Sequence, residues 1–179
     1  MTKTKKIVDF LSLDIDTIRQ SIRDIDDSYN NPWDILAELC QNAVDAIRKG
    51  KPSRGEIQIE INAPQKEIRI QDNGVGISPS DMPRLLKPFV PDKRTDEETI
   101  GEKGVGLTFV MFSCDDFYIK SGNNYGASEG MIKGAHTWKN SDSPEPVELI
   151  HKKISENVQG TEIVLQKVRE CSIFNLKYP

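Results

Sequence analysis

Two neighbouring segments of alternating polar and apolar residues constrain the fold of this chain more than any other feature. Residues 56–62 read EIQIEIN and residues 66–72 read KEIRIQD, so isoleucine alternates with polar residues in both. A period of two is typical of strands with one buried face. The short turn at residues 63–65 predicts that the two strands form an antiparallel hairpin. The apolar face of this hairpin then requires a second layer to cover it.

Helices are predicted before the hairpin and strands mostly after it. Residues 14–27 carry isoleucines spaced by three or four positions, which predicts an amphipathic helix. A second helix is expected to begin after Pro32 and to end near Lys49, before Gly50. Further elements are expected as a short helix at residues 80–86 and strands at residues 116–121, 130–138, 146–151 and 161–167. This order predicts an α/β fold, a two-layer sandwich whose mostly antiparallel, mixed sheet carries helices on one face.

Composition limits the size and the partners of this fold. The 179 residues are 36% hydrophobic, enough for one domain with a sizeable core. The 24 basic and 28 acidic residues give a net charge of -4, which indicates neither a nucleic-acid-binding nor a membrane surface. The chain has no run of about 18 apolar residues and no signal peptide, so we expect a cytoplasmic protein. Cys40, Cys114 and Cys171 form no C-x-x-C pair, which favours buried thiols over a metal site or disulfides.

The second predicted helix carries a polar stripe. It contains ELCQNAVDA at residues 38–46, and at about 100° per residue Glu38, Asn42 and Asp45 fall on one side. The opposite side, expected to face the core, would carry Leu36, Cys40, Ala43 and Ile47. Taken alone, the stripe is more typical of the solvated side of a surface helix, so its meaning depends on the motifs that follow.

Two glycine-rich segments follow. DNGVG at residues 72–76 ends the second hairpin strand, where glycines let a backbone approach a flat ligand, although the same residues also make a simple turn. GEKGVGL at residues 101–107 precedes a helix expected to reach about Cys114. Glycines at a helix start expose N–H groups suited to phosphate, although a flexible loop before a helix has the same composition. Neither segment is a P-loop or a G-x-G-x-x-G dinucleotide turn.

Taken in order, these segments resemble the ATP-binding motifs of the GHKL superfamily, which includes DNA gyrase, the ninety-kilodalton heat-shock chaperone, histidine kinases and the mismatch-repair protein MutL. E-x-x-x-N-A-x-D-A matches residues 38–46, D-x-G-x-G matches residues 72–76, and G-x-x-G-x-G matches residues 101–106. The terminal G-T of the family matches residues 160–161. The resemblance spans residues 30–167 and implies a Bergerat-type sandwich with an ATP lid.

The resemblance implies a role for each matching residue. Asn42 resembles the ligand that holds Mg²⁺ against the triphosphate. Asp72 resembles the acceptor for the adenine exocyclic amine, and Thr161 a hydroxyl that supports this contact through water. The other positions expected to surround the nucleotide are Asp45, Gly74, Gly76, Gly101, Gly104, Val105 and Gly106, together with Lys93 and Lys103 of the lid at residues 88–106. For both lysines, a solvated charge on a loop is an equally good interpretation.

Glu38 decides the reaction class that the resemblance implies. In the gyrase, chaperone and MutL branches, a glutamate four residues before the asparagine activates the attacking water, and Glu38 holds that position. Residues 85–93 are faintly similar to the phenylalanine box of the histidine-kinase branch. His136 and His151 both follow the nucleotide motifs, however, so no phosphoacceptor histidine precedes them, and both are expected to be ordinary surface or core side chains. The chaperone and MutL branches are therefore favoured.

The motifs predict an Mg²⁺-dependent ATPase, slow as an isolated domain, whose lid closes on ATP and joins two copies or two domains. Two alternatives stay open: an ATP sensor without hydrolysis, and a histidine-kinase-like catalytic domain with a separate His-bearing partner. The expected ligands are ATP or ADP and Mg²⁺, with no membrane or nucleic-acid partner indicated. Residues 1–13 are expected to form an N-terminal arm, residues 14–170 the ATP-binding domain, and residues 171–179 a linker to a further region. The motifs do not choose among chaperone, DNA-linked, defence and signalling roles.

Overall fold

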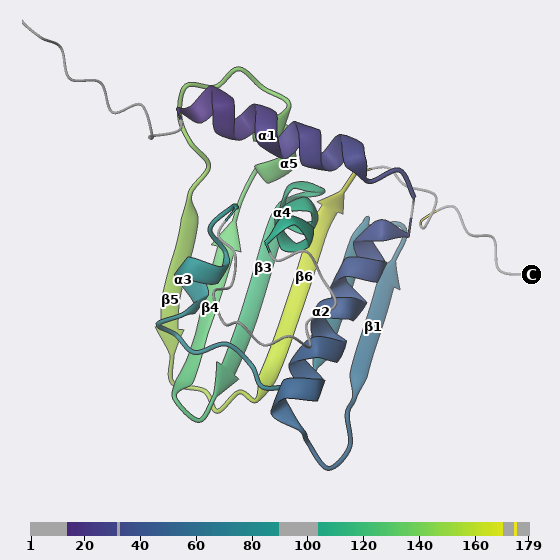
Figure 1. Cartoon of the computed structure of the whole chain (residues 1–179), viewed down its shortest axis with the longest axis vertical. Helices are drawn as coiled ribbons and strands as arrows, with labels where there is room; N and C mark the ends of the chain where they lie inside the picture. Colours follow the sequence, from purple (N-terminus) through teal and green to yellow (C-terminus); the bar gives the residue numbers. More distant parts are fainter. Residues whose placement is uncertain (1–13, 32, 90–103, 170–173, 175–179) are drawn as a thin grey trace, which may run out of the picture.

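The fold is built on one antiparallel sheet. A computed structural model describes residues 14–31, 33–89, 104–169 and 174 (Figure 1). Within these residues, six strands lie in the order β1-β2-β6-β3-β4-β5, and every neighbouring pair is antiparallel. The strands are β1 (Ile57–Asn62), β2 (Glu67–Asp72), β3 (Cys114–Asn123), β4 (Gly126–Ile132), β5 (Leu149–Ile154) and β6 (Gly160–Val168). The predicted arm at residues 1–13, and the predicted linker at residues 171–179 apart from Phe174, lie outside the described residues.

Helices form the second layer. They are α1 (Ile15–Ser28), α2 (Asp34–Gly50), α3 (Met82–Leu85), α4 (Val105–Phe112) and α5 (Ala135–Lys139). Figure 1 shows them on one face of the sheet, which confirms the predicted two-layer α/β sandwich. The core lies between the layers and includes Ile22, Leu39 and Phe109 from the helices and Ile68, Phe117 and Leu165 from the strands. No helix in the described part of the chain is long and apolar enough to cross a membrane.

The β1–β2 hairpin forms as the alternation predicts. Ile59 pairs with Ile70 and Ile61 pairs with Ile68, so the isoleucines share one face. The isoleucines of β2 are buried, whereas those of β1 keep between 36% and 42% of their exposure, because β1 is an edge strand. The adjoining α2 helix therefore covers this end of the sheet only in part.

The buried face of α2 differs in part from the predicted one. Ile35, Leu39 and Ala43 are buried, whereas Leu36, Cys40 and Ile47 are only half-buried. On a helical projection this face lies about 100° from Glu38 and not opposite it. The prediction was right for Ala43, and Leu36 and Cys40 pack against the core, but it missed Ile35 and Leu39. Apolar residues surround most of α2, so periodicity alone does not identify the side that faces the sheet. As a result, Glu38 flanks the core and is half-buried.

Three predicted boundaries also differ. The strand expected at residues 130–138 ends at Ile132, and Gly134, with a φ of 70°, leads into α5 instead. The strand expected at residues 146–151 begins at Leu149. Helix α4 ends at Phe112, because Cys114 already begins β3. A single left-handed glycine and a five-residue helix leave too little periodicity to be separated from a strand.

Candidate nucleotide site

The DNGVG loop is joined to the C-terminal half of α2. The Val75 N–H donates to the Ala46 carbonyl at 2.9 Å. A Cβ added at Gly74 would lie 2.5 Å from the carbonyl carbon of Ala46, so only glycine fits there. Because Ala46 follows Asn42 by about one helical turn, the loop lies beside the polar stripe of α2.

Three polar residues are paired across adjacent strands, near the ends of those strands. Asp72 of β2 pairs with Thr161 of β6, and Thr161 pairs with Ser121 of β3. Residues paired across neighbouring strands point to the same side of the sheet. The second and fourth motifs, which are 88 positions apart at Asp72 and Gly160, are thereby brought together, and a Cβ on Gly160 would lie 2.0 Å from the Asp72 carbonyl oxygen.

The hydrogen bonds of Ser121 and Thr161 fix the direction in which their hydroxyl protons point. The Ser121 hydroxyl donates to the Gly160 carbonyl at 2.9 Å and accepts the Ile77 N–H at 2.8 Å. The Thr161 hydroxyl lies 2.8 Å from the Ser121 hydroxyl. Since Ser121 has only one hydroxyl proton, Thr161 must donate to it. The Thr161 oxygen therefore keeps acceptor capacity for a ligand or a water molecule.

Asp72 is a buried carboxylate. It is 8% exposed, and its Oδ1 accepts the Gly74 N–H at 2.8 Å. Burial raises the pKa of Asp72 above its usual range, while hydrogen bonds from the Gly74 and Thr161 backbone oppose this increase. A desolvated carboxylate with a perturbed pKa at a strand end is a candidate for ligand recognition.

Helix α4 begins beside Glu38. Gly104 precedes the helix with a φ of 96°, a left-handed conformation that favours glycine, and Val105 is the first helical residue. A Cβ added at Gly106 would lie 1.8 Å from the Glu38 Oε2. The carboxylate of Glu38 thus lies against the first turn of α4, where the helix dipole favours negative charge. Gly106, the last residue of the third motif, therefore contacts the N-terminal half of α2.

The other residues of the α2 stripe differ in exposure, since Asp45 is half-buried. Asn42 is exposed, and Asp45 forms an ion pair with Arg48 at 3.6 Å. Among the described residues, no group of three or more His, Cys, Asp or Glu side chains could hold a metal ion. An exposed amide oxygen suits Mg²⁺, which takes few protein ligands and keeps several waters, so Asn42 fits the predicted role.

Three predicted site residues are not placed. Lys93, Gly101 and Lys103 lie outside the described residues, as does most of the predicted lid. Of the lid at residues 88–106, the structure describes only residues 88–89 and 104–106. The phosphate-binding roles of the two lysines and of Gly101 therefore stay predictions.

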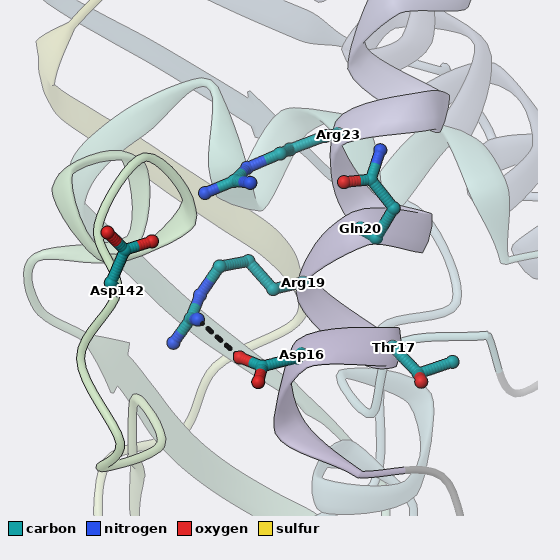
Figure 2. Close-up of a pocket in the computed structure, with 6 residues that line it drawn as sticks. All are labelled: Asp16, Thr17, Arg19, Gln20, Arg23 and Asp142. Carbon is teal, nitrogen blue, oxygen red and sulfur yellow. Dashed lines mark hydrogen bonds and ion pairs between the residues drawn. The ribbon is translucent and has the colours of Figure 1, made fainter.

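A separate hollow of about 600 Å³ lies on α1, away from all four motifs. Figure 2 shows Arg19 and Arg23 extending from α1 toward the segment that carries Asp142. Arg19 forms an ion pair with Asp16 at 2.9 Å and also donates to the Ser143 carbonyl. Arg23 donates to the Lys139 carbonyl at 2.8 Å. These arginines connect α1 to the end of α5 and the loop after it, so a structural role accounts for both side chains.

Comparison with known proteins agrees with this geometry. The sequence model of the family described as "Histidine kinase-, DNA gyrase B-, and HSP90-like ATPase" matches residues 31–170, more than half of the chain. The chain belongs to this ATPase family. The assignment to the GHKL superfamily from four short motifs is thereby confirmed, as is the fold class.

The relatives within the family include chaperones and a repair protein. The chain is 25% identical to the chaperone protein HtpG of Rickettsia akari over 170 residues, which cover 82% of this chain and 26% of HtpG. It is 28% identical to HtpG of Borreliella burgdorferi over 164 residues, which cover 79% of this chain and 25% of that protein. It is 31% identical to the DNA mismatch repair protein MutL of Aquifex pyrophilus over 96 residues, which cover 50% of this chain and 21% of MutL. The chain thus spans about a quarter of the length of the curated relatives it matches.

Two further residues at the candidate site were not predicted. Ser121 bonds to Gly160, Thr161 and Ile77 and is fully buried. Gln159 donates from its side-chain amide to the Gly74 carbonyl at 2.8 Å. Gln159 directly precedes the G-T motif, which is a signal that sequence reasoning could have used. Ser121 has no such signal, because its position depends on the register of β3 against β6.

Proposed function

We propose that this chain is the Mg²⁺-dependent ATP-binding module of a larger protein and that it hydrolyses ATP slowly. The observation that supports this most is the convergence of the four motifs. The DNGVG loop contacts Ala46 of α2, Gly106 meets Glu38 of the same helix, and Thr161 pairs with Asp72. Membership of the ATPase family supports nucleotide binding, and hydrolysis by this chain is the step that we add.

Asp72 and Thr161 would select adenine. Both offer acceptors, Asp72 through its carboxylate and Thr161 through a hydroxyl oxygen whose proton is directed to Ser121. The exocyclic amine of adenine is a donor and satisfies them. Guanine presents a carbonyl oxygen at that position, so the carboxylate would face an acceptor and gain no hydrogen bond from the base, which is unfavourable. Asp72 is therefore the residue expected to discriminate ATP from GTP.

Asn42 and Glu38 would act at the phosphates. Asn42 would hold Mg²⁺ through its amide oxygen, and bound Mg²⁺ supplies positive charge to the phosphate oxygens. Glu38 would accept a proton from the attacking water while the water oxygen bonds to the outer phosphorus. The bond from that phosphorus to the bridging oxygen breaks, and the products are ADP and inorganic phosphate.

The proposal also covers what ATP binding does in the larger protein. We keep the prediction that ATP closes the lid at residues 88–106 and joins two copies or two domains. A cytoplasmic location belongs to the same proposal. Light scattering of the chain with Mg-ATP and with Mg-ADP tests the association, and a molar mass that doubles only with Mg-ATP is the expected result.

Nucleotide binding is tested by thermal unfolding with Mg-ATP, Mg-ADP and Mg-GTP. A ligand at about 100 times its dissociation constant raises the free energy of unfolding by roughly 2.7 kcal/mol. We expect this increase with the adenine nucleotides and little change with Mg-GTP. Asp72→Asn should remove the preference for adenine. If the variant keeps that preference, Asp72 does not contact the base.

Hydrolysis is tested by measuring ADP release for the wild type and for Glu38→Ala. The variant should bind ATP and release ADP far more slowly, whereas Glu148→Ala, at an exposed position, should match the wild type. Equal turnover in Glu38→Ala would remove Glu38 from the mechanism. Tight ATP binding without turnover in the wild type would identify a sensor, and transfer of phosphate to a histidine of a partner protein would identify a kinase domain.

A further inference from the structure

Tyr29 lies at the point where α1, α2 and α4 meet. It caps the C-terminus of α1, where its backbone N–H donates to the Asp26 carbonyl at 3.2 Å. Its ring stacks on Phe109 of α4 with the centroids 3.8 Å apart and the planes inclined by 7°. Phe109 is 1% exposed, and the Arg169 guanidinium lies 5.2 Å from its ring. The tyrosine ring is therefore held both by the backbone and by a rigid partner.

The Tyr29 hydroxyl reaches Glu38. It donates to Oε1 of Glu38 at 2.9 Å, a hydrogen bond to a carboxylate, which is among the stronger kinds. The other oxygen, Oε2, occupies the space in which a Cβ of Gly106 would lie. One oxygen of Glu38 is thus fixed by the tyrosine, and the other lies against the first turn of α4.

We infer that Tyr29 is a positioning residue for Glu38, an inference that rests on the proposed role of Glu38 in hydrolysis. A glutamate side chain has several rotatable bonds and, when half-exposed, adopts many rotamers. A general base must keep its oxygen within hydrogen-bond reach of the water it activates. The hydroxyl of Tyr29, fixed through its ring on Phe109, restricts the carboxylate to one orientation. Tyr29 itself does not contact the reacting atoms.

The test is Tyr29→Phe, which keeps the ring and its stacking and removes only the hydroxyl. We expect kcat for ADP release to fall by roughly tenfold, the size associated with losing one hydrogen bond to a charged group. The dissociation constant for Mg-ATP should stay at its wild-type value. The matched control is Tyr118→Phe, a half-buried tyrosine on the opposite face of the sheet, which should leave kcat unchanged.

A double-mutant cycle separates positioning from other effects. In the Glu38→Ala background, Tyr29→Phe should cause no further loss of turnover, because its target is absent. Wild-type kcat in Tyr29→Phe, together with lost turnover in Glu38→Ala, overturns the inference and leaves the proposed function standing. A weaker affinity for Mg-ATP that accompanies the loss of kcat also overturns it, because that result indicates a general disturbance of the site. Wild-type turnover in Glu38→Ala overturns the proposed function itself.

Discussion

At Asp72 the proposed role in binding opposes stability. Its carboxylate is 8% exposed at the end of β2, and burial raises its pKa. Because the pKa is higher in the folded state than in the unfolded state, the folded state holds the proton more tightly. The stability contributed by this group is fully present below the unfolded pKa and is lost as the pH rises through the folded pKa. At neutral pH the ionised side chain therefore destabilises the fold.

We predict that Asp72→Asn raises the melting temperature of the nucleotide-free protein at neutral pH. Asparagine removes the buried charge, and its side-chain oxygen can still accept the Gly74 N–H. The difference from the wild type should shrink as the pH is lowered through the folded pKa of Asp72. Thermal unfolding of both proteins from neutral to acidic pH measures this. Asp142→Asn, at an exposed site, should change the free energy of unfolding by less than about 0.5 kcal/mol. A lower melting temperature for Asp72→Asn at neutral pH would contradict the prediction.

The residues that could be predicted are those in short contiguous motifs. Glu38 and Asp72 were identified from such motifs, and the structure brings both into contact with other motif residues. Ser121 and Tyr29 could not be identified in this way. Ser121 depends on strand register, and Tyr29 depends on the packing of α1 against α4. Neither property is encoded in a local pattern, because both arise from contacts between distant segments.

At the scale of the elements, backbone contacts join the strand ends around the site. Gly76 has a φ of 66°, and a Cβ there would lie 1.9 Å from the Gly122 carbonyl oxygen. Gly160 has a φ of 91° and would place a Cβ 2.0 Å from the Asp72 carbonyl oxygen. Backbone atoms cannot move aside as the end of a flexible side chain can. These glycines therefore fix the relative positions of β2, β3 and β6 at the site.

We predict that Gly160→Ala destabilises the protein far more than Gly134→Ala. Both glycines have positive φ, but a Cβ at Gly134 has no atom within 4 Å. Gly134→Ala should cost only the left-handed strain, about 1–2 kcal/mol. Gly160→Ala adds a clash with backbone and should cost about 2–5 kcal/mol in total. Urea unfolding measures both values. Equal decreases in the free energy of unfolding would show that the backbone around Gly160 shifts at little cost.

Elements with a strong periodicity of apolar residues were predictable, and elements with a weak periodicity were not. The hairpin of β1 and β2 was expected at residues 56–62 and 66–72 and forms within one residue of these bounds. Residues 130–138 also mix apolar and polar positions, yet Gly134 adopts a left-handed conformation there and ends the strand. The side of α2 that faces the sheet was predicted only in part, because apolar residues surround most of that helix. Packing, and not local pattern, selects the buried side.

At the scale of the whole molecule, one carboxylate joins the two ends of the domain. Asp26 of α1 accepts from Lys139 of α5 at 2.6 Å and from Arg169, just after β6, also at 2.6 Å. Lys139 is 1% exposed, and burial lowers its pKa, an effect that Asp26 opposes. The first helix, the last helix and the last strand of the described domain are thereby held at a single point.

We predict that Asp26→Ala lowers the free energy of unfolding by about 3–5 kcal/mol, because it leaves one buried and one partly buried cation without their shared partner. Lys139→Met is the matched control. Methionine fills the space of the lysine stem, and Asp26 stays paired with Arg169, so the expected change is under about 1.5 kcal/mol in either direction. Urea unfolding of the two variants measures the difference. If Lys139→Met were as damaging as Asp26→Ala, the attachment of α1 would depend on the packing of the lysine side chain. If neither had an effect, the buried charges would be compensated by water, and the domain ends would be held by the apolar core alone.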